Sequence, residues 1–288
     1  PIEAVMTGLP GLQQTRSTSR YGLSQVTVIF KDGTDIYFAR QLVNQRLQEA
    51  RESLPEGVTP TMGPISSGLG EIYLWTVEAD PSARKEDGTP YTPTDLREIQ
   101  DWVIKPQLRN LAGVTEINSI GGYAKEYQVA PSTERLASYG LTLTDVMTAL
   151  DRNNANVGAG YIERNGEQYL IRAPGQVRSI DDIKDIVLTS VQGQAIRIRD
   201  IADVGIGREL RTGAATDNGE EVVLGTVFML IGENSRSVSQ AVSARLDTIN
   251  KSLPQGVKAV TVYDRTNLID KAIATVKKNL LELSLIHI

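Results

Sequence analysis

The chain has 288 residues, enough for two or three domains of ordinary size, and its 40% hydrophobic and 23% charged residues are typical of globular proteins. The net charge of −5, with no basic run interleaved with aromatic residues, argues against nucleic-acid binding. Cysteine is absent, which excludes thiolate sites, and because the single histidine is His287, a histidine base or a histidine-rich zinc site is nearly excluded.

The first predicted elements recur late in the chain. Residues 53–58 read SLPEGV and residues 252–257 read SLPQGV. Each copy follows a strand, a turn and a helical pattern: 26–30, 31–33 and 36–52 before the first, and 225–230, 231–234 and 237–251 before the second. The proline ends each helix and the glycine lets the chain turn into an extended segment. Such helix exits are common, so chance is the alternative, but the matched order favours a structural repeat.

Residues 71–122 predict a strand, a helix and a second strand. EIYLWTVEA (71–79) is rich in β-branched and aromatic residues, and GVTEINSIGG (113–122) is the next strand-like segment. Since each strand flanks the same helix, we expect both strands to belong to one sheet.

The helix between these strands has clear boundary signals. Thr92 is a good N-cap, and Asp95 is placed to close a capping box with it. We expect the helix to reach about Asn110, with Pro106 kinking or ending it. Four of its apolar residues are expected to face inward: Leu96, Ile99, Trp102 and Val103.

Residues 125–224 differ from the segments on either side. They contain several short strand-like segments and capping signals but no large apolar helix, which indicates a mixed, mostly β domain inserted into its neighbour. Two strand–helix–strand modules separated by this insertion predict an α+β fold with ferredoxin-like subdomains.

The two ends suggest a segment of a longer protein. Residues 1–11 resemble the last turns of a helix stopped by glycine and proline. Residues 270–282 form an amphipathic helical pattern, and LSLIHI (283–288) then follows abruptly. No run of 18 or more apolar residues is present, so no transmembrane helix is predicted.

The candidate residues for a functional site are two carboxylates, Glu71 and Glu116. No phosphate-binding loop, dinucleotide fingerprint or nucleophile–base set occurs, so an enzyme is the least favoured class. Glu71 begins an otherwise apolar strand and Glu116 lies in the second strand of the same module, so the two could share a face or a cleft edge. Together they would form a hard, oxygen-rich and weak site for a divalent cation. The alternative, which the pattern alone favours, is that each is a solvated glutamate at a strand end.

Several longer motifs resemble one known family. They are GLGEIY, PYTPTDLR, LAGVTEINSIGGY, NNANVGAGYIER, ELRTGAAT and VVLGTVFMLIGENSR, in this order and together with both SLPxGV copies. They resemble the heavy-metal efflux branch of the resistance-nodulation-division (RND) transporters, and within it the cobalt–zinc–cadmium (Czc-type) inner-membrane pumps. The resemblance covers residues 1 to about 282.

The resemblance implies a division into porter and docking subdomains. The implied parts are the C-terminal part of the first porter subdomain (1–64), the two halves of the second (65–124 and 225–268), a docking subdomain (125–224) and the approach to a transmembrane helix (269–282). Residues 283–288 do not resemble the family and are expected to be a non-native tail.

The resemblance also implies a function. The intact protein would be a proton-driven homotrimer at the periplasmic face of the inner membrane of a Gram-negative bacterium. It would export Zn²⁺, Co²⁺ or Cd²⁺ with a periplasmic adaptor (membrane fusion protein) and an outer-membrane channel, without a permanently bound cofactor. The membrane would be reached through segments missing here, so this portion would not pump alone.

Within the family, Glu71 and Glu116 match carboxylates that contribute to the metal site of zinc-type members. Two other functions are alternatives. A pump that exports organic compounds is expected to line its pocket with aromatic residues, which make up only 5% of this chain. A soluble periplasmic binding or adaptor module would need intact ends.

Overall fold

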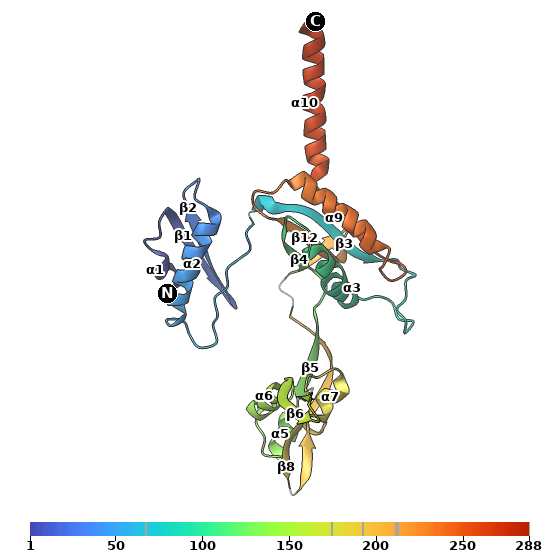
Figure 1. Ribbon diagram of the computed structural model, residues 1–288. Coiled ribbons are helices and arrows are strands. Elements are labelled where there is room, and N and C mark those ends of the chain that lie inside the picture. The colour runs from blue at the N-terminus through green and yellow to red at the C-terminus, as the bar shows by residue number, and fades with distance from the viewer. Residues whose placement is uncertain (67, 174, 192, 211–212, 288) are drawn as a thin grey trace. The chain divides into compact units, whose positions relative to one another are not determined.

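The computed structural model describes residues 1–66, 68–173, 175–191, 193–210 and 213–287 (Figure 1). The chain divides into two compact units, Pro1–Ile65 and Ser66–Ile288. The first contains a hairpin with two helices, and the second contains an antiparallel sheet together with the inserted segment.

The first unit packs helices α1 (Ile2–Met6) and α2 (Ile36–Arg51) against an antiparallel hairpin of β1 (Leu12–Arg20) and β2 (Leu23–Phe30). Its buried centre is small and consists of Met6, Leu9 and Leu47. Asp35 caps α2 by accepting hydrogen bonds from the backbone N–H groups of the first turn. The predicted strand and helix before SLPEGV are confirmed, whereas the polar strand β1 was not predicted.

The expectation of an extended strand after SLPEGV is wrong. Within the described residues 52–66, no segment belongs to a strand. A strand is stable only when a neighbouring strand satisfies its backbone groups. In the described part of this unit β2 pairs with β1 alone, and the segment after residue 58 pairs with neither of these strands.

The second unit contains a sheet in the order β4–β12–β3–β13, in which every neighbouring pair is antiparallel. The strands are β3 (Glu71–Ala79), β4 (Val114–Ile120), β12 (Glu220–Met229) and β13 (Val257–Asp264). A short strand, β11 (Ala215–Asp217), pairs with the start of β12. The first strand–helix–strand module supplies β3 and β4, and the second supplies β12 and β13. Strands of the two modules alternate in the sheet, as in a ferredoxin-like fold, so this prediction is confirmed.

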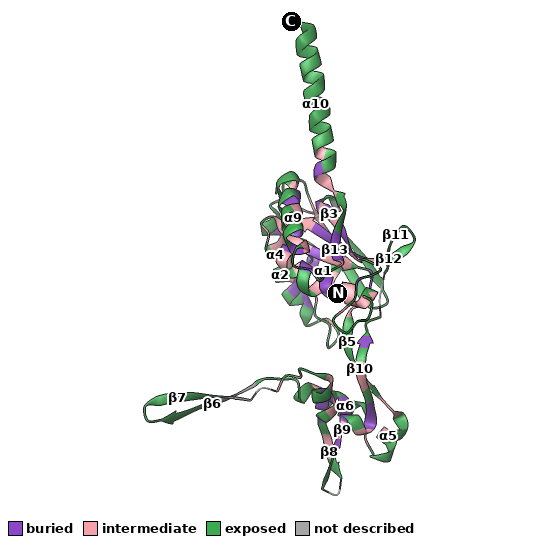
Figure 2. Ribbon diagram, turned by 90° about the vertical axis from the view of Figure 1, so that its right-hand side faces the viewer, coloured by how far each residue is buried: buried purple, intermediate pink, exposed green. Residues whose placement is uncertain are grey.

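Helices cover one face of this sheet (Figure 1). They are the segment after Thr92 and α9 (Ser235–Asn250), which confirms the helix predicted before SLPQGV. Apolar side chains fill the space between: Tyr73, Trp75, Val77, Ile99, Ile104, Leu108, Ile117, Val223, Val227, Val238, Val242, Leu246 and Ile249. Figure 2 shows this buried layer in purple. The opposite side of the sheet is called the outer face below.

The helix after Thr92 changes its winding midway. It consists of α3 (Pro93–Ile99), the π-helical segment η2 (Gln100–Ile104) and α4 (Lys105–Arg109). The capping box of Thr92 and Asp95 is present as predicted. Pro106 does not end the helix. Instead, the Lys105 N–H donates to the Gln100 carbonyl five residues earlier, so a wide turn precedes the proline, which has no N–H to donate.

The wide turn also changes which residues face inward. Trp102 is 79% exposed and Val103 is 36% exposed, so the prediction that they face inward is wrong. The extra residue of a π-helical turn rotates the positions that follow it, and this brings Ile104 to the sheet instead. Gln100 is fully buried, and its side-chain oxygen accepts a hydrogen bond of 2.9 Å from Trp75 Nε1.

The inserted segment leaves and rejoins the sheet through paired strands, β5 (Lys125–Pro131) and β10 (Ala202–Arg208). Between them lie short elements: α5 (Thr133–Ser138), α6 (Leu143–Arg152), β6 (Val157–Arg164), β7 (Glu167–Ala173), α7 (Ile180–Asp185), β8 (Val187–Val191), β9 (Gln194–Arg197) and α8 (Ile198–Ile201). Nine buried residues, including Val146 and Ile201, form a core of its own. The described residues of this segment combine short strands with short helices and include no large apolar helix, as predicted.

The last helix, α10 (Arg265–His287), is exposed along nearly its whole described length (Figure 2). Arg236 of α9 forms an ion pair of 2.8 Å with Asp270 near its start. Among the described helices, none is both long and apolar enough to cross a membrane.

Candidate metal-binding site

Glu71 and Glu116 lie in one row across the sheet. Glu71 is the first residue of β3, and Glu116 lies near the start of β4. Phe228 of the intervening strand β12 is the cross-strand partner of both, Glu71 on one side and Glu116 on the other. Directly opposed residues of antiparallel strands point to the same face. The structure therefore brings the two predicted carboxylates to one face, with an aromatic residue between them.

This row points to the outer face, away from the helices. Val227 is buried in the core beneath the helices, and its neighbour Phe228 consequently points the other way. Tyr73, Trp75 and Val77 of β3 alternate toward the helices, so strict alternation would place Glu71 in the core as well. The register between β3 and β12 shifts at this level, and Ile72 is the extra residue. This β-bulge turns Glu71 to the outer face.

A second register shift lies on the other side of β12 at the same level. Phe228 pairs with Glu116, whereas Met229 pairs with Val114, which leaves Thr115 as the extra residue of β4. Bulges redirect side chains and are frequent beside functional sites. The two irregularities flank the row that contains both glutamates.

The start of β3 is held in place from two directions. Gly70, in the short turn η1 (Gly68–Gly70), packs so closely on β12 that a Cβ atom there would lie 3.0 Å from the Met229 carbonyl oxygen. Arg265, at the start of α10, donates a hydrogen bond from Nη1 to the Leu69 carbonyl oxygen. The backbone of Glu71 is thus positioned by both neighbouring segments.

The remaining surroundings are polar. Thr226 occupies the next outer-face position of β12 and is paired across the strands with Asn118. Thr226 is only 2% exposed, and among the described residues its hydroxyl has no hydrogen-bond partner. Glu71, Glu116 and Phe228 are each partly buried.

The two carboxylates form an incomplete ligand set. Within the described residues, no group of three or more histidine, cysteine, aspartate or glutamate side chains is placed to hold a metal ion. Carboxylate oxygens suit hard or borderline divalent cations, and two of them without nitrogen or sulfur ligands bind such ions weakly. The arrangement therefore permits weak capture of a divalent cation, with further ligands supplied by water.

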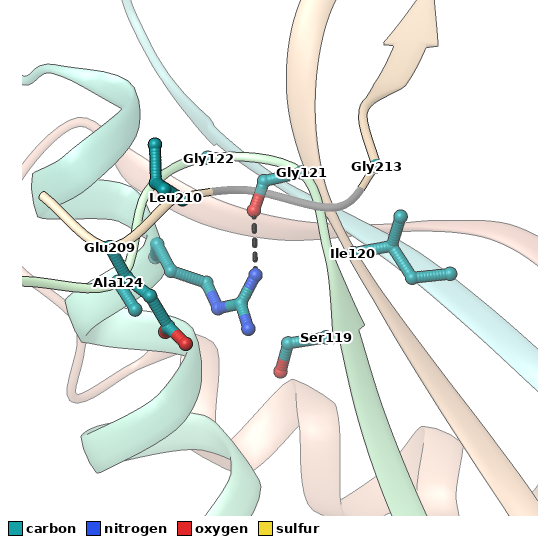
Figure 3. Close-up of a pocket in the computed structure, with 9 residues that line it drawn as sticks. Ser119, Ile120, Gly121, Gly122, Ala124, Glu209, Leu210 and Gly213 are labelled. Atoms are coloured by element: carbon teal, nitrogen blue, oxygen red, sulfur yellow. Dashed lines mark hydrogen bonds between the residues drawn. The ribbon is translucent and has the colours of Figure 1, made fainter. Parts of the chain in front are cut away.

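A separate cavity of about 270 Å³ lies where the inserted segment meets the sheet (Figure 3). Neither glutamate is among the residues that line it, which are Arg97, Ser119, Ile120, Gly121, Gly122, Ala124, Glu209, Leu210 and Gly213. Arg97 Nη1 donates to the Gly121 carbonyl at 2.8 Å, and its Nε contacts Asp101 at 2.6 Å. Since Ser119 also donates to Asp101 at 2.6 Å, this network ties the end of β4 to the helix.

The glycine pair at this junction is sterically required. Gly121 and Gly122 have φ values of 80° and 61°, where other residues are strained. A Cβ atom on Gly121 would lie 2.3 Å from the Val222 carbonyl oxygen, and one on Gly122 would lie 2.6 Å from that of Pro93. The glycine pair was visible in the sequence, but nothing in its pattern pointed to the cavity or to the Arg97–Asp101 pair.

Comparison with known proteins places the chain in a family. Residues 1–288 match the AcrB/AcrD/AcrF family along their whole length. The chain belongs to this family. It is 77% identical over 282 residues to the cobalt-zinc-cadmium resistance protein CzcA of Cupriavidus metallidurans, and 62% identical over 282 residues to protein HelA of Legionella pneumophila. The family resemblance inferred from the motifs is thereby confirmed.

A solved structure also supports the assignment of the chain to this family. The chain matches the X-ray crystal structure of a heavy metal efflux pump (crystal form I) with a TM-score of 0.85 and 32% sequence identity. The matches to CzcA, HelA and the crystallised pump each cover 98% of this chain. The chain spans about a quarter of the length of these relatives: 26% of CzcA and 27% of both HelA and the crystallised pump.

Proposed function

We propose that the chain is the porter and docking portion of a proton-driven efflux pump for divalent heavy-metal cations, with Zn²⁺, Co²⁺ and Cd²⁺ as its substrates. The identity of 77% to a protein named for cobalt, zinc and cadmium resistance supports this substrate class. The role is transport rather than catalysis, and this portion does not pump alone.

The proposed division follows the observed elements. Residues 1–64 are the C-terminal part of a first porter subdomain, and residues 65–124 with 225–268 form the second. The interleaved order of β3, β4, β12 and β13 supports this assembly from two distant stretches. Residues 125–224 form the docking subdomain and 269–282 approach a transmembrane helix, whereas a non-native origin of 283–288 stays a prediction.

We infer the assembly and the location from family membership. The intact pump is a homotrimer at the periplasmic face of the inner membrane, and it works with a periplasmic adaptor and an outer-membrane channel. The docking subdomain is the part of this chain that faces toward the channel.

Glu71 and Glu116 together hold the cation during transport. The observation that carries this assignment is their common row on the outer face, on either side of Phe228, with the bulge at Ile72 turning Glu71 out of the core. Oxygen ligands favour Zn²⁺, Co²⁺ and Cd²⁺ over Cu⁺ or Ag⁺, which prefer sulfur. Weak binding suits transport, because the ion must also leave.

The test is zinc resistance of cells that carry a full-length pump with Glu71→Gln or Glu116→Gln. Each substitution removes a charge but preserves shape, so pump abundance should stay the same while the tolerated zinc concentration falls. Glu78→Gln is the matched control, because Glu78 lies at the far end of β3 and accepts a hydrogen bond from Thr76. Unchanged resistance in both variants at normal abundance would refute the assignment.

A further inference from the structure

Phe228 occupies the space between the two proposed ligands. It is paired with Glu71 on one side and with Glu116 on the other, and all three side chains point to the outer face. Directly opposed Cβ atoms lie about 5 Å apart in antiparallel pairs, so the two glutamate Cβ atoms lie about 10 Å apart. Phe228 lies midway between these two Cβ atoms.

A single ion would have to draw the carboxylates together. Carboxylate oxygens bind zinc at about 2.0–2.2 Å, so two oxygens on one ion lie no more than about 4.4 Å apart. To reach this separation, both glutamates must lean toward β12, over the residue that lies between them. That residue is a phenylalanine, whose bulk opposes the approach and which supplies no ligand atom of its own.

We propose that Phe228 determines the selectivity of the site by keeping the two glutamates from closing directly on one ion. The cation binds one carboxylate directly and reaches the other through its own water. This inference rests on the proposed function and adds the form in which the substrate is held, a partly hydrated divalent cation.

Thr226 provides independent support for water at this site. Its hydroxyl is buried and unpartnered among the described residues, and it is the outer-face neighbour of Phe228 on β12. A buried hydroxyl without a partner costs about 1–3 kcal/mol. A water molecule that is shared with the bound cation would satisfy it.

Indirect binding has a consequence for selectivity. Affinity differences among divalent metal ions arise largely from direct ligand bonds, and they shrink when water intervenes. A spacer between the carboxylates therefore yields weak binding with little discrimination among Zn²⁺, Co²⁺ and Cd²⁺. Without the spacer, one ion would gain a second direct ligand, and both the affinity and the spread among metals would rise.

The experiment is a metal titration of the purified 288-residue chain with chlorides of zinc, cobalt and cadmium. Backbone amide NMR signals of Glu71 and Glu116 give the binding curve at this site, separately from other carboxylates. Phe228→Ala should lower the zinc dissociation constant at least tenfold and widen the spread among the metals. Leu224→Ala, on the same strand and face, is the matched control and should leave binding unchanged.

A double-mutant cycle separates spacing from a general structural effect. In the parent chain, the effects of Glu71→Gln and Glu116→Gln on zinc binding should be nearly additive, because the ion bonds directly to only one of them. In the Phe228→Ala background they should become strongly coupled. If Phe228→Ala does not fold, Phe228→Leu replaces it, since leucine keeps an apolar side chain but removes the ring, and tighter zinc binding is again expected.

The outcomes distinguish the two claims. If the glutamate substitutions weaken zinc binding but the Phe228 substitutions change neither affinity nor coupling, the spacer is refuted and the metal site stands. If neither glutamate substitution alters zinc binding in any background, the metal site itself is refuted, and the role of Phe228 with it.

Discussion

The segments that end in SLPEGV and SLPQGV are alike up to the end of their helices and differ afterwards. Matching positions are occupied, without a gap, by Gly33 and Gly232 in the turn, Asp35 and Asn234 at the N-cap, Leu47 and Leu246 on the buried helix face, and Gly57 and Gly256 at the corner. After the second copy, β13 pairs with β3 along its whole length. After the first copy, residues 59–66 form no strand.

This difference shows that the corner depends on nearby residues alone, whereas the strand after it depends on a partner strand. The corner requires only a proline, and a glycine whose φ is 82° in both copies. The strand after it requires a sheet edge, which β3 provides in the second unit. Asn250 also holds that strand, because its amide donates to the Ala259 carbonyl at 2.9 Å and its oxygen accepts from the Ala259 N–H at 2.8 Å. Arg51 occupies the matching place in the first copy.

The largest contrast is expected between the two matched leucines. Leu246→Ala should destabilise the second unit by an amount near the upper end of the usual ~2–5 kcal/mol range, because it empties part of an extensive core. Leu47→Ala should fall near the lower end, since the apolar cluster around Leu47 has fewer buried members among the described residues. Urea unfolding followed by hydrogen exchange in each unit measures both. Equal losses would contradict the comparison.

An intermediate contrast is expected at the ends of the helices. Asn250→Ala should cost about 1–3 kcal/mol, because it leaves two backbone groups of β13 without partners. Arg51→Ala, at an exposed position, should change stability by less than about 0.5 kcal/mol. Faster amide exchange at Ala259 in the first variant would locate the effect. A large loss from Arg51→Ala would indicate that the first corner holds a strand after all.

The smallest contrast concerns pH. Among the described residues, the carboxyl groups whose pKa is clearly lowered are those of Asp87, Asp95, Asp145 and Asp182, and all of these belong to the second unit. Burial of Asp95 raises its pKa, but hydrogen bonds from the hydroxyl and N–H of Thr92 and from Lys85 outweigh burial and lower the pKa below 3.8. A lowered pKa stabilises the fold above the unfolded value and loses this contribution as the pH falls through the folded value.

Asp95→Asn should therefore cost about 1 kcal/mol at neutral pH, a typical capping contribution, and the difference should shrink as the pH falls below about 4. The measurement is the free energy of unfolding of both proteins between pH 3 and pH 7. A difference that stays constant over this range would show that the charge of Asp95 contributes nothing.

The sequence predicted the parts of the fold that local signals determine. The capping box at Thr92, the helix before each SLPxGV and the strand that begins at Glu71 all follow from residue type and spacing. It could not predict the fate of the segment after SLPEGV, which depends on a partner strand. It also missed the inward position of Gln100, because the π-helical turn that changes the helical period leaves no periodic signal of its own.

The sequence predicted the two glutamates of the candidate site but not their arrangement, because that arrangement depends on strand pairing. Residue type and resemblance pointed to Glu71 and Glu116, but strict alternation along β3 would have directed Glu71 into the core. The bulge at Ile72 reverses this, and Phe228 comes between the glutamates only through pairing with a strand more than 100 residues away. Such pairings are tertiary and leave no mark in the local pattern.

The most direct test of the metal assignment is anomalous diffraction from zinc-soaked crystals of a complete pump that carries this segment. The proposed site predicts an anomalous peak within bonding distance, about 2.0–2.2 Å, of a carboxylate oxygen of Glu71 or Glu116 and beside the ring of Phe228. Zinc peaks elsewhere in the pump, with none at either glutamate, would contradict it.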